Sequence, residues 1–257
     1  KLNHSSINHG CLLSRQKCFR YKHLELNHLE SFLKKVPINS NKLIISETLF
    51  SMDGDFLDID GIRFLSKKYN AILYLDEAHS VGIYGKNGFG ICSDFNKSEN
   101  EVIVGTLSKA FGCYGAFLSC SKKLYKLIVN KCAGLIYSTA LPPAVLGSIY
   151  ASVKFVPNAI FLRKKLKKNS SFVLESLKKL NFNTGNSNSH IIPIIIKDKI
   201  KREKICRSLI SNGFYVKEIR TPTVPKGSER IRLSLTATMG LHLLKKFIKT
   251  ISVFESK

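Results

Sequence analysis

The chain has 257 residues, of which 44% are hydrophobic and 10% aromatic, a composition typical of a globular protein and not of a disordered or fibrous one. Lysine and arginine total 41 against 18 acidic residues, which gives a net charge of +23. The basic residues are spread along the chain, with one dense run at residues 163–168, and no stacking aromatics interleave with them. A solvated surface is therefore favoured, and a nucleic-acid-binding module is the alternative. No apolar run approaches the ~20 residues that span a bilayer, so no membrane partner is expected.

Cysteine usage and the start of the chain predict the cellular compartment. The seven cysteines form no CxxC pair and show no Cys/His spacing typical of a metal site. We predict reduced thiols that mostly contribute to packing, no bound metal, and a cytoplasmic location. The chain begins at Lys1 with polar residues that carry no signal-peptide pattern.

Strand and helix patterns alternate through the first half of the chain. Strands are expected at residues 42–49, 71–75, 102–104 and 115–118, and a helix at residues 60–69. This alternation predicts an α/β fold with a mostly parallel sheet, in which ligands bind beyond the carboxyl ends of the strands. The polar residues that follow strands are therefore candidate site residues: Ser51, Asp76, His79, Thr106 and Lys109.

The pattern changes after Pro142 and Pro143, which open a helix expected to reach residue 155. Pro157 starts a second helix that carries the basic run towards Leu180. Three strands, at residues 190–196, 215–219 and 230–235, and two helices, at 201–211 and 241–253, are expected after it. We predict a large domain at residues 1–156 and a smaller C-terminal α+β domain at residues 157–257.

Two motifs at strand ends indicate chemistry. In GTLSKAFG, residues 105–112, Lys109 follows a strand, and a desolvated lysine there can form a Schiff base; a surface lysine at a helix start is the alternative. In LDEAHSVG, residues 75–82, Asp76 ends a buried strand and needs a cationic partner. Pyridoxal phosphate (PLP) would supply one at its pyridine nitrogen. By themselves, Asp76 and His79 fit a metal site or a structural ion pair equally well.

Six motifs occur in order along nearly the whole chain. They are LNHSSI (residues 2–7), ETLFSMDGD (47–55), LDEAHSVGIYGKNGFG (75–90), GTLSKAFG (105–112), LIYSTALPPA (135–144) and IRTPTVPKGSERIRLSLTA (219–237). Together they resemble the fold-type I PLP enzymes, and their details are similar to those of the α-oxoamine synthase family. That family condenses an amino acid with an acyl-CoA. The resemblance implies PLP as cofactor, a transferase activity and the PLP-dependent transferase fold, with an N-terminally incomplete large domain.

The resemblance also implies roles for individual residues. Lys109 would hold the cofactor covalently and then act as the base that removes the α-proton of the amino acid. Asp76 would pair with the pyridine nitrogen. His79 and Ser51 would bond the side of the ring that carries the phenolic oxygen, and Thr106 would bond the phosphate.

Three further residues are implied from the two outer motifs. His4 would stack on the ring face and contact the substrate, which suits an aromatic plane; a terminal polar histidine is the alternative. Ser138 and Thr139 would reach the phosphate of the neighbouring subunit's cofactor. The active sites would then be shared across a homodimer.

The arginine-rich C-terminal motif implies the substrate contacts. Arg232 would clamp the amino-acid carboxylate, because a guanidinium binds the planar group in a bidentate manner. Arg220 and Thr223 would lie near the acyl substrate. For Arg230 we expect a solvated strand residue.

The motifs at residues 135–144 and 219–237 most resemble the family members that join L-alanine to pimeloyl-CoA, or to a pimeloyl carrier-protein thioester, with loss of carbon dioxide in biotin synthesis. Sister enzymes use glycine or serine with other thioesters. Family members also carry an earlier part of the large domain, so this chain is expected either to be a piece of a longer one or to be a remnant. A sheet that lacks its first strands is expected to expose an apolar edge.

Two other classes compete with this reading. The first is a non-catalytic subunit that keeps the fold and docks on an active homologue, although Lys109, Asp76 and His79 together argue against it. The second is the basic nucleic-acid-binding module, which a steep salt dependence of DNA binding would support. An aminotransferase is a weaker enzyme alternative, because the C-terminal motif is of the acyl-thioester type.

Overall fold

The computed structural model describes residues 2–94 and 98–255. The chain divides into two compact units. The N-terminal unit comprises Asn3–Leu49 and Leu57–Ala159, and the C-terminal unit comprises Phe50–Phe56 and Ile160–Lys257 together with Leu2. The segment Phe50–Phe56 thus groups with the C-terminal unit, a grouping that the domain boundary predicted from the sequence does not include.

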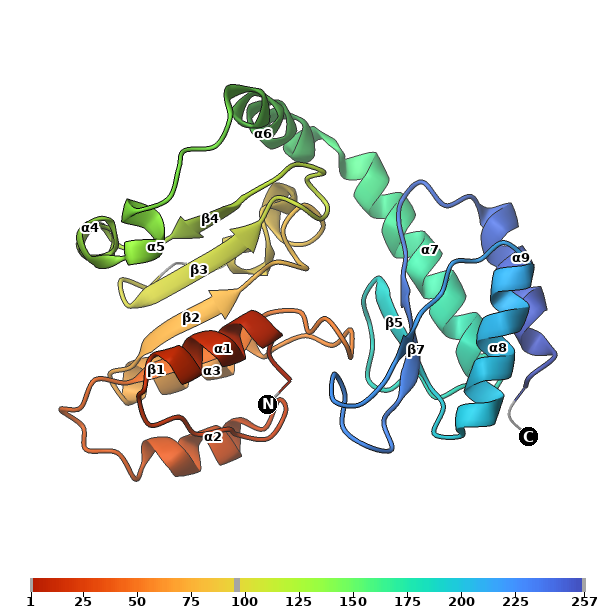
Figure 1. The fold of residues 1–257 in the computed structure, drawn as a ribbon, viewed down its shortest axis with the longest axis horizontal. Coiled ribbons are helices and arrows are strands. Elements are labelled where there is room, and N and C mark those ends of the chain that lie inside the picture. Colours follow the sequence, from red (N-terminus) through yellow and green to blue (C-terminus); the bar gives the residue numbers. More distant parts are fainter. Residues whose placement is uncertain (1, 95–97, 256–257) are drawn as a thin grey trace. The chain divides into compact units, whose positions relative to one another are not determined.

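A four-stranded sheet forms the centre of the N-terminal unit, in the order β1 (Leu43–Glu47), β2 (Ile72–Asp76), β3 (Glu101–Thr106) and β4 (Ala116–Ser119) (Figure 1). The first three strands are parallel, and β4 pairs antiparallel with β3. The predicted mostly parallel sheet is therefore confirmed. Each predicted strand overlaps an observed one, with shifts of one or two residues at most of the ends.

Helix α3 (Ile59–Lys68) packs against β2 and shows why the local sequence folds in this way. The Asp58 side chain caps its first turn by accepting a 2.9 Å hydrogen bond from the amide of Gly61. Ile62 and Leu65, three residues apart, are buried on one face. The unit's other helices are α1 (Ser5–Leu13), α2 (Leu26–Leu33), α4 (Lys122–Lys131), α5 (Ala133–Ile136) and α6 (Pro143–Phe155), with 3-10 turns η1 (Lys86–Gly88), η2 (Ile91–Asp94) and η3 (Val156–Asn158).

The β4 side of this sheet leaves apolar side chains exposed. All four residues of β4 are exposed, including Leu118 at 44%. Helices α4, α5 and α6 contain no buried residue, and Tyr137, which follows α5, is 86% exposed. The expectation of an exposed apolar edge is confirmed, and such a surface favours association.

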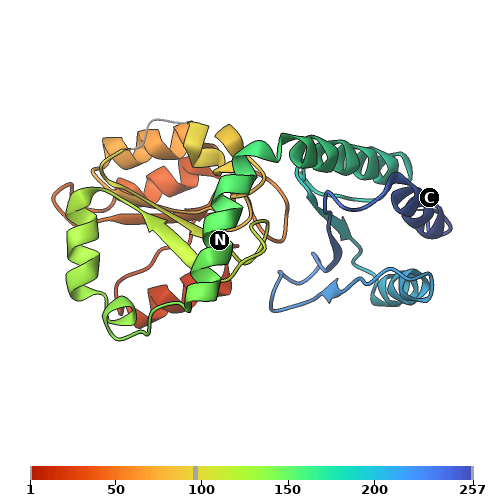
Figure 2. The same ribbon diagram turned by 90° about the horizontal axis from the view of Figure 1, so that it is seen from above.

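The C-terminal unit holds a three-stranded antiparallel sheet in the order β5 (Ile191–Ile195), β7 (Arg230–Ser234) and β6 (Glu218–Ile219). Pro193 lies inside β5, where an edge strand tolerates the missing amide hydrogen. Helix α9 (Leu241–Ser252) contacts both α7 (Ile160–Lys179) and α8 (Lys199–Ser211), and α7 and α8 contact the sheet (Figure 2). The predicted α+β unit is present, but β6 has two residues instead of the five expected at 215–219, and Tyr215 is 92% exposed.

The basic run, the cysteines and the helix lengths test three expectations drawn from the composition. The lysines of the basic run lie exposed on α7. All seven cysteines are free; Cys92 and Cys206 are buried, whereas Cys18 and Cys132 are exposed, so packing explains only some of them. Among the residues that the structure describes, no single helix combines the length and apolar composition needed to cross a bilayer. Residues 143–158 and 160–179 reach that length and composition only when they are taken together as a bent pair.

Candidate functional site

The carboxyl ends of β2 and β3 bring the main candidate residues to one edge of the sheet. Asp76 is the last residue of β2, and Thr106 is the last residue of β3. The strands pair in parallel with Asp76 opposite Val104, and the Glu77 amide donates a 2.7 Å hydrogen bond to the Val104 carbonyl. The segments that follow the two strands therefore begin side by side, as the sequence predicts.

Asp76 and His79 lie in the turn that leaves β2. The Asp76 carboxylate is half-buried, and its Oδ1 accepts a 2.8 Å hydrogen bond from the Ala78 amide. That bond fixes the side chain against its own turn. His79 is also half-buried. Within the described residues no group of three or more His, Cys, Asp or Glu side chains could hold a metal ion.

Lys109 lies beyond β3, and its Nζ donates a 3.4 Å hydrogen bond to Thr106 Oγ1. The loop is anchored by Leu107 and Phe111, which are 6% and 7% exposed and pack with Val81. Lys109 itself is exposed. Of the two alternatives that the sequence left open, a desolvated and a surface lysine, the chain as described has Lys109 at the surface, while its apolar neighbours Leu107 and Phe111 are buried.

His4 lies in the N-terminal unit at the start of α1. Its Nδ1 accepts a 3.3 Å hydrogen bond from the Ser6 amide and lies 2.8 Å from Ser6 Oγ. The imidazole thus caps the helix while the residue remains exposed. This geometry fits a local capping role and leaves ring stacking as a prediction.

Ser138 and Thr139 follow α5 in a stretch where residues 133–140 are all exposed. Ser138 Oγ donates a 3.2 Å hydrogen bond to the Leu135 carbonyl. The apolar neighbours Leu135 and Tyr137 are 50% and 86% exposed. Both hydroxyl residues are therefore presented at the surface of the unit, beside apolar side chains.

The C-terminal unit holds a second group of residues, around β7. Arg232 Nη1 donates a 3.0 Å hydrogen bond to the Ser51 carbonyl. Arg230 is 2% exposed, and its Nη1 donates to the Met52 carbonyl at 2.9 Å and to Asp53 Oδ1 at 2.7 Å. The solvated Arg230 expected from the sequence is therefore wrong, because the segment Phe50–Phe56 packs on it within this unit. Ser51, which the sequence predicts as a ring contact, is 4% exposed.

The surroundings of Arg232 are strongly desolvated. Burial lowers the pKa of the Arg232 guanidinium from its ordinary value. Burial also lowers the pKa of His190 to about 4, with a smaller contribution from the charge of Arg232. A neutral buried imidazole therefore lies near a half-buried cation that favours an anionic partner.

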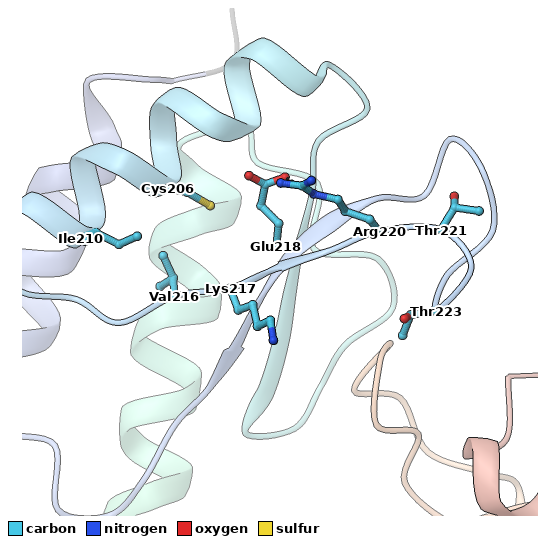
Figure 3. A pocket seen from close by; sticks show the side chains of 8 residues that line it. All are labelled: Cys206, Ile210, Val216, Lys217, Glu218, Arg220, Thr221 and Thr223. Carbon is cyan, nitrogen blue, oxygen red and sulfur yellow. Dashed lines mark hydrogen bonds and ion pairs between the residues drawn. The ribbon is translucent and has the colours of Figure 1, made fainter.

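Arg220 and Thr223 line an open cavity of about 450 Å³ at β6 (Figure 3). Its other walls include Cys206 and Ile210 of α8. Arg220 Nε donates a 3.1 Å hydrogen bond to Glu218 Oε2, so the cation already has an acidic partner inside its own unit. Glu218 also accepts a 3.0 Å bond from Arg202, whose side chain is only 4% exposed.

Two residues with structural importance at the site were missed by the sequence reasoning. Asp53 binds Arg230, and the motif letters SMDGD indicate only a turn. Glu77 is 1% exposed beside Asp76. A charged residue next to the last residue of a buried strand is the one signal in the sequence that could have pointed to Glu77.

The fold is that of a PLP-dependent fold-type I enzyme. Residues 1–251 match the aminotransferase class I and II family, to which the chain belongs. The chain is 40% identical over 238 residues to a Magnetococcus marinus protein that carries the provisional name 8-amino-7-oxononanoate synthase, covering 92% of this chain and 60% of the relative. A Geobacillus kaustophilus protein with the same provisional name is 39% identical over 241 residues, covering 93% and 62%. The chain thus spans about 60% of the length of these curated relatives.

Solved structures agree with this family. A Sphingomonas wittichii serine palmitoyltransferase matches with TM-score 0.92 and 27% identity, over 98% of this chain and 64% of that one. An 8-amino-7-oxononanoate synthase from Francisella tularensis matches with TM-score 0.86 and 28% identity, over 98% and 73%. A further serine palmitoyltransferase structure, with TM-score 0.91 and 26% identity, contains PLP. The predicted fold type, the PLP-dependent family and its α-oxoamine synthase branch are confirmed.

Proposed function

We propose that this chain carries the catalytic centre of an α-oxoamine synthase that joins L-alanine to pimeloyl-CoA, or to a pimeloyl carrier-protein thioester, in biotin biosynthesis. The observation that carries the proposal is the meeting of Asp76, Thr106 and Lys109 at the carboxyl edge of β2 and β3. The provisional names of the relatives favour this substrate pair. Because the chain spans about 60% of their length, the activity is proposed for the chain in its full protein context.

The residues at the edge fit PLP chemically. Asp76 offers a carboxylate for the pyridine nitrogen, His79 offers a partner for the ring oxygen, and Thr106 offers a hydroxyl for the phosphate. Ser51, which belongs to the C-terminal unit, is proposed as a further partner for the ring oxygen. Lys109, exposed and hydrogen-bonded to Thr106, offers the amine that a Schiff base needs. When bound, PLP supplies an electron sink for carbanion chemistry at the substrate α-carbon.

The chain's own groups then have defined tasks. Asp76 would pair with the pyridine nitrogen of bound PLP and favour its protonated form, and the bond from the Ala78 amide fixes the direction of the carboxylate. Lys109 Nζ accepts the α-proton of the amino acid and returns a proton to the same carbon after carbon dioxide leaves. Arg232 binds the amino-acid carboxylate through its half-buried guanidinium. His4 contacts the substrate, and Arg220 with Thr223 lies near its acyl part.

We also propose a homodimer in the cytoplasm. The exposed apolar residues around Ser138 and Thr139 support an interface there, and the seven free thiols support a reducing compartment. In that dimer, Ser138 and Thr139 reach the phosphate of the partner subunit's cofactor.

A second candidate is the condensation of serine or glycine with a different acyl-CoA. Its support is the match to solved serine palmitoyltransferases, with TM-scores up to 0.92. A non-catalytic subunit would have no use for Lys109, Asp76 and His79 together, so we rank it lower.

The substrate proposal is tested by the release of free thiol from acyl-CoA in the presence of PLP. The protein is given pimeloyl-CoA or palmitoyl-CoA with L-alanine, glycine or serine in turn, and Lys109→Ala serves as control. We expect thiol release with L-alanine and pimeloyl-CoA that the control lacks. Release only with serine or glycine would establish the second candidate, and no release from a folded protein that binds PLP would contradict both.

A further inference from the structure

Glu77 lies in the chain between two residues of the proposed site, the acidic Asp76 and the imidazole-bearing His79. Unlike those two residues, which are half-buried, Glu77 is only 1% exposed. An ionisable side chain at this depth is costly unless hydrogen bonds compensate for its lost hydration. Its backbone is also held: the amide donates to the Val104 carbonyl at 2.7 Å, and the carbonyl accepts from the Ser80 amide at 2.9 Å. Glu77 is therefore fixed at the point where β2 becomes the turn that carries His79.

The Glu77 carboxylate joins three separate segments of the N-terminal unit. Oε1 accepts hydrogen bonds from the Cys92 amide at 3.0 Å, from Ser80 Oγ at 3.0 Å and from Thr48 Oγ1 at 3.4 Å. Thr48 follows β1, and Ser80 lies in the turn after β2. Cys92 lies in η2, at the end of the glycine-rich loop, which we define as residues 82–92. One carboxylate thus connects the carboxyl ends of two strands with the loop that follows the second.

The glycine-rich loop packs directly against this carboxylate. Gly90 has a φ of +99°, and a Cβ added there would lie 2.1 Å from Glu77 Oε2. Gly85, at φ +75°, would place a Cβ 1.7 Å from the Gly90 carbonyl oxygen. Both positions need glycine for backbone conformation and for close approach. The loop therefore closes directly onto Glu77.

The electrostatics agree with this packing. Burial raises the pKa of Glu77, and hydrogen bonds from the Cys92 amide and the Ser80 hydroxyl oppose that rise. Burial likewise raises the pKa of the Cys92 thiol. The carboxylate is thus placed for holding backbone and hydroxyl donors, not for exchange with solvent.

We propose that Glu77 is a positioning residue that locks the turn at residues 76–79 against the glycine-rich loop at residues 82–92, and so sets the orientation of Asp76 and His79 toward the cofactor. The effect on the cofactor rests on the proposed function. The fixing of the turn against the loop rests only on the contacts described above. Glu77 touches neither substrate nor cofactor in this scheme. It acts through the turn and the loop.

The test compares Glu77→Gln with Glu101→Gln in the full chain. Glu101 is a matched control: it is 0% exposed and ion-paired with Arg63, but it is the first residue of β3, at the opposite end of that strand from Thr106. PLP binding is followed by absorbance titration and by visible circular dichroism, which reports the orientation of the bound ring. Hydrogen exchange of residues 77–92 is measured without cofactor.

We expect Glu77→Gln to weaken PLP binding about tenfold, to change the dichroism and to speed exchange in residues 77–92. Glu101→Gln should leave PLP binding and the dichroism at wild-type values and should not speed exchange preferentially in residues 77–90; Cys92 is left out of this comparison because the charge of Glu101 acts on it. Ser80→Ala, which deletes one donor to Glu77, should show smaller changes in the same direction and replaces Glu77→Gln if that variant does not fold. Unchanged exchange in the Glu77 variant, or equal changes in both glutamine variants, would overturn the proposal. If the wild type binds no PLP, the proposed function fails, whereas the exchange data still decide whether Glu77 locks the loop.

Discussion

Arg230 Nη1 donates a 2.7 Å hydrogen bond to Asp53 Oδ1 and so joins two residues 177 positions apart in the chain. Both belong to the C-terminal unit, because the segment Phe50–Phe56 packs there and not with the strand that precedes it. Arg230 also holds the Met52 carbonyl, and Arg232 holds the Ser51 carbonyl. Two arginines of β7 therefore fix the backbone on which Ser51 lies.

Replacing Arg230 should destabilise the C-terminal unit. Arg230→Met removes a 2% exposed cation and leaves the Asp53 carboxylate without its charged partner. We expect the free energy of unfolding to fall by about 3 kcal/mol, the range for breaking a largely buried ion pair. Urea unfolding followed by circular dichroism measures it.

The matched control for that variant is Arg207→Met, since the Arg207 side chain is 81% exposed in a pair with Glu203. Its free energy of unfolding should stay within about 0.5 kcal/mol of the wild type. Equal losses in the two variants would show that the Arg230–Asp53 bond does not contribute in the manner described.

His190 should make stability depend on pH. Its pKa is about 4 in the folded chain, against an ordinary value of 6.5, because burial disfavours the imidazolium. Between these values the unfolded chain binds a proton that the folded chain does not. The free energy of unfolding should therefore decrease as the pH falls from about 6.5 to about 4, by about 3 kcal/mol from this group.

Urea unfolding at several pH values measures that dependence. In His190→Asn the part of the decrease that belongs to this residue should disappear, whereas His242→Asn, at an exposed position, should retain it. A His190→Asn variant with the wild-type pH dependence would refute the assignment.

The positions of Asp76, Thr106 and Lys109 could be predicted from the sequence. Short apolar runs followed by polar residues are local signals for strand ends, and parallel pairing then brings those ends to one edge. Helix α4 was missed although its cap is local: Ser121 Oγ accepts a hydrogen bond from the Leu124 amide. None of its side chains is buried, so it lacks the buried apolar face by which a core helix is recognised in a sequence.

The burial of Arg230 could not be predicted from the sequence. Alternation along β7 indicates that Arg230 and Arg232 share one face of the strand, opposite Ile231 and Leu233. It does not reveal what covers that face, and the covering segment Phe50–Phe56 lies far away in the chain. Glu77 has the same difficulty, since two of its partners, Thr48 and Cys92, come from other segments.

The proposed sharing of sites across a dimer predicts complementation. Lys109→Ala subunits are mixed with subunits that carry both Ser138→Ala and Thr139→Ala, each inactive alone in the proposed scheme. A mixed dimer would contain one site with intact Lys109 and intact hydroxyls from its partner. Random mixing should then restore about a quarter of wild-type activity, because half of the dimers carry one complete site of two. Mixtures as inactive as the separate variants would contradict the shared site.

The most direct test of the account is the attachment of the cofactor to Lys109. The protein is incubated with PLP, reduced with borohydride, digested and analysed by mass spectrometry, with Lys109→Ala and the exposed Lys126→Ala as controls. We predict that the reduced cofactor is recovered on the peptide that contains Lys109, in the wild type and in Lys126→Ala, and that Lys109→Ala carries no specific label. Label distributed over surface lysines, with Lys109 not preferred in a folded protein, would contradict the central claim.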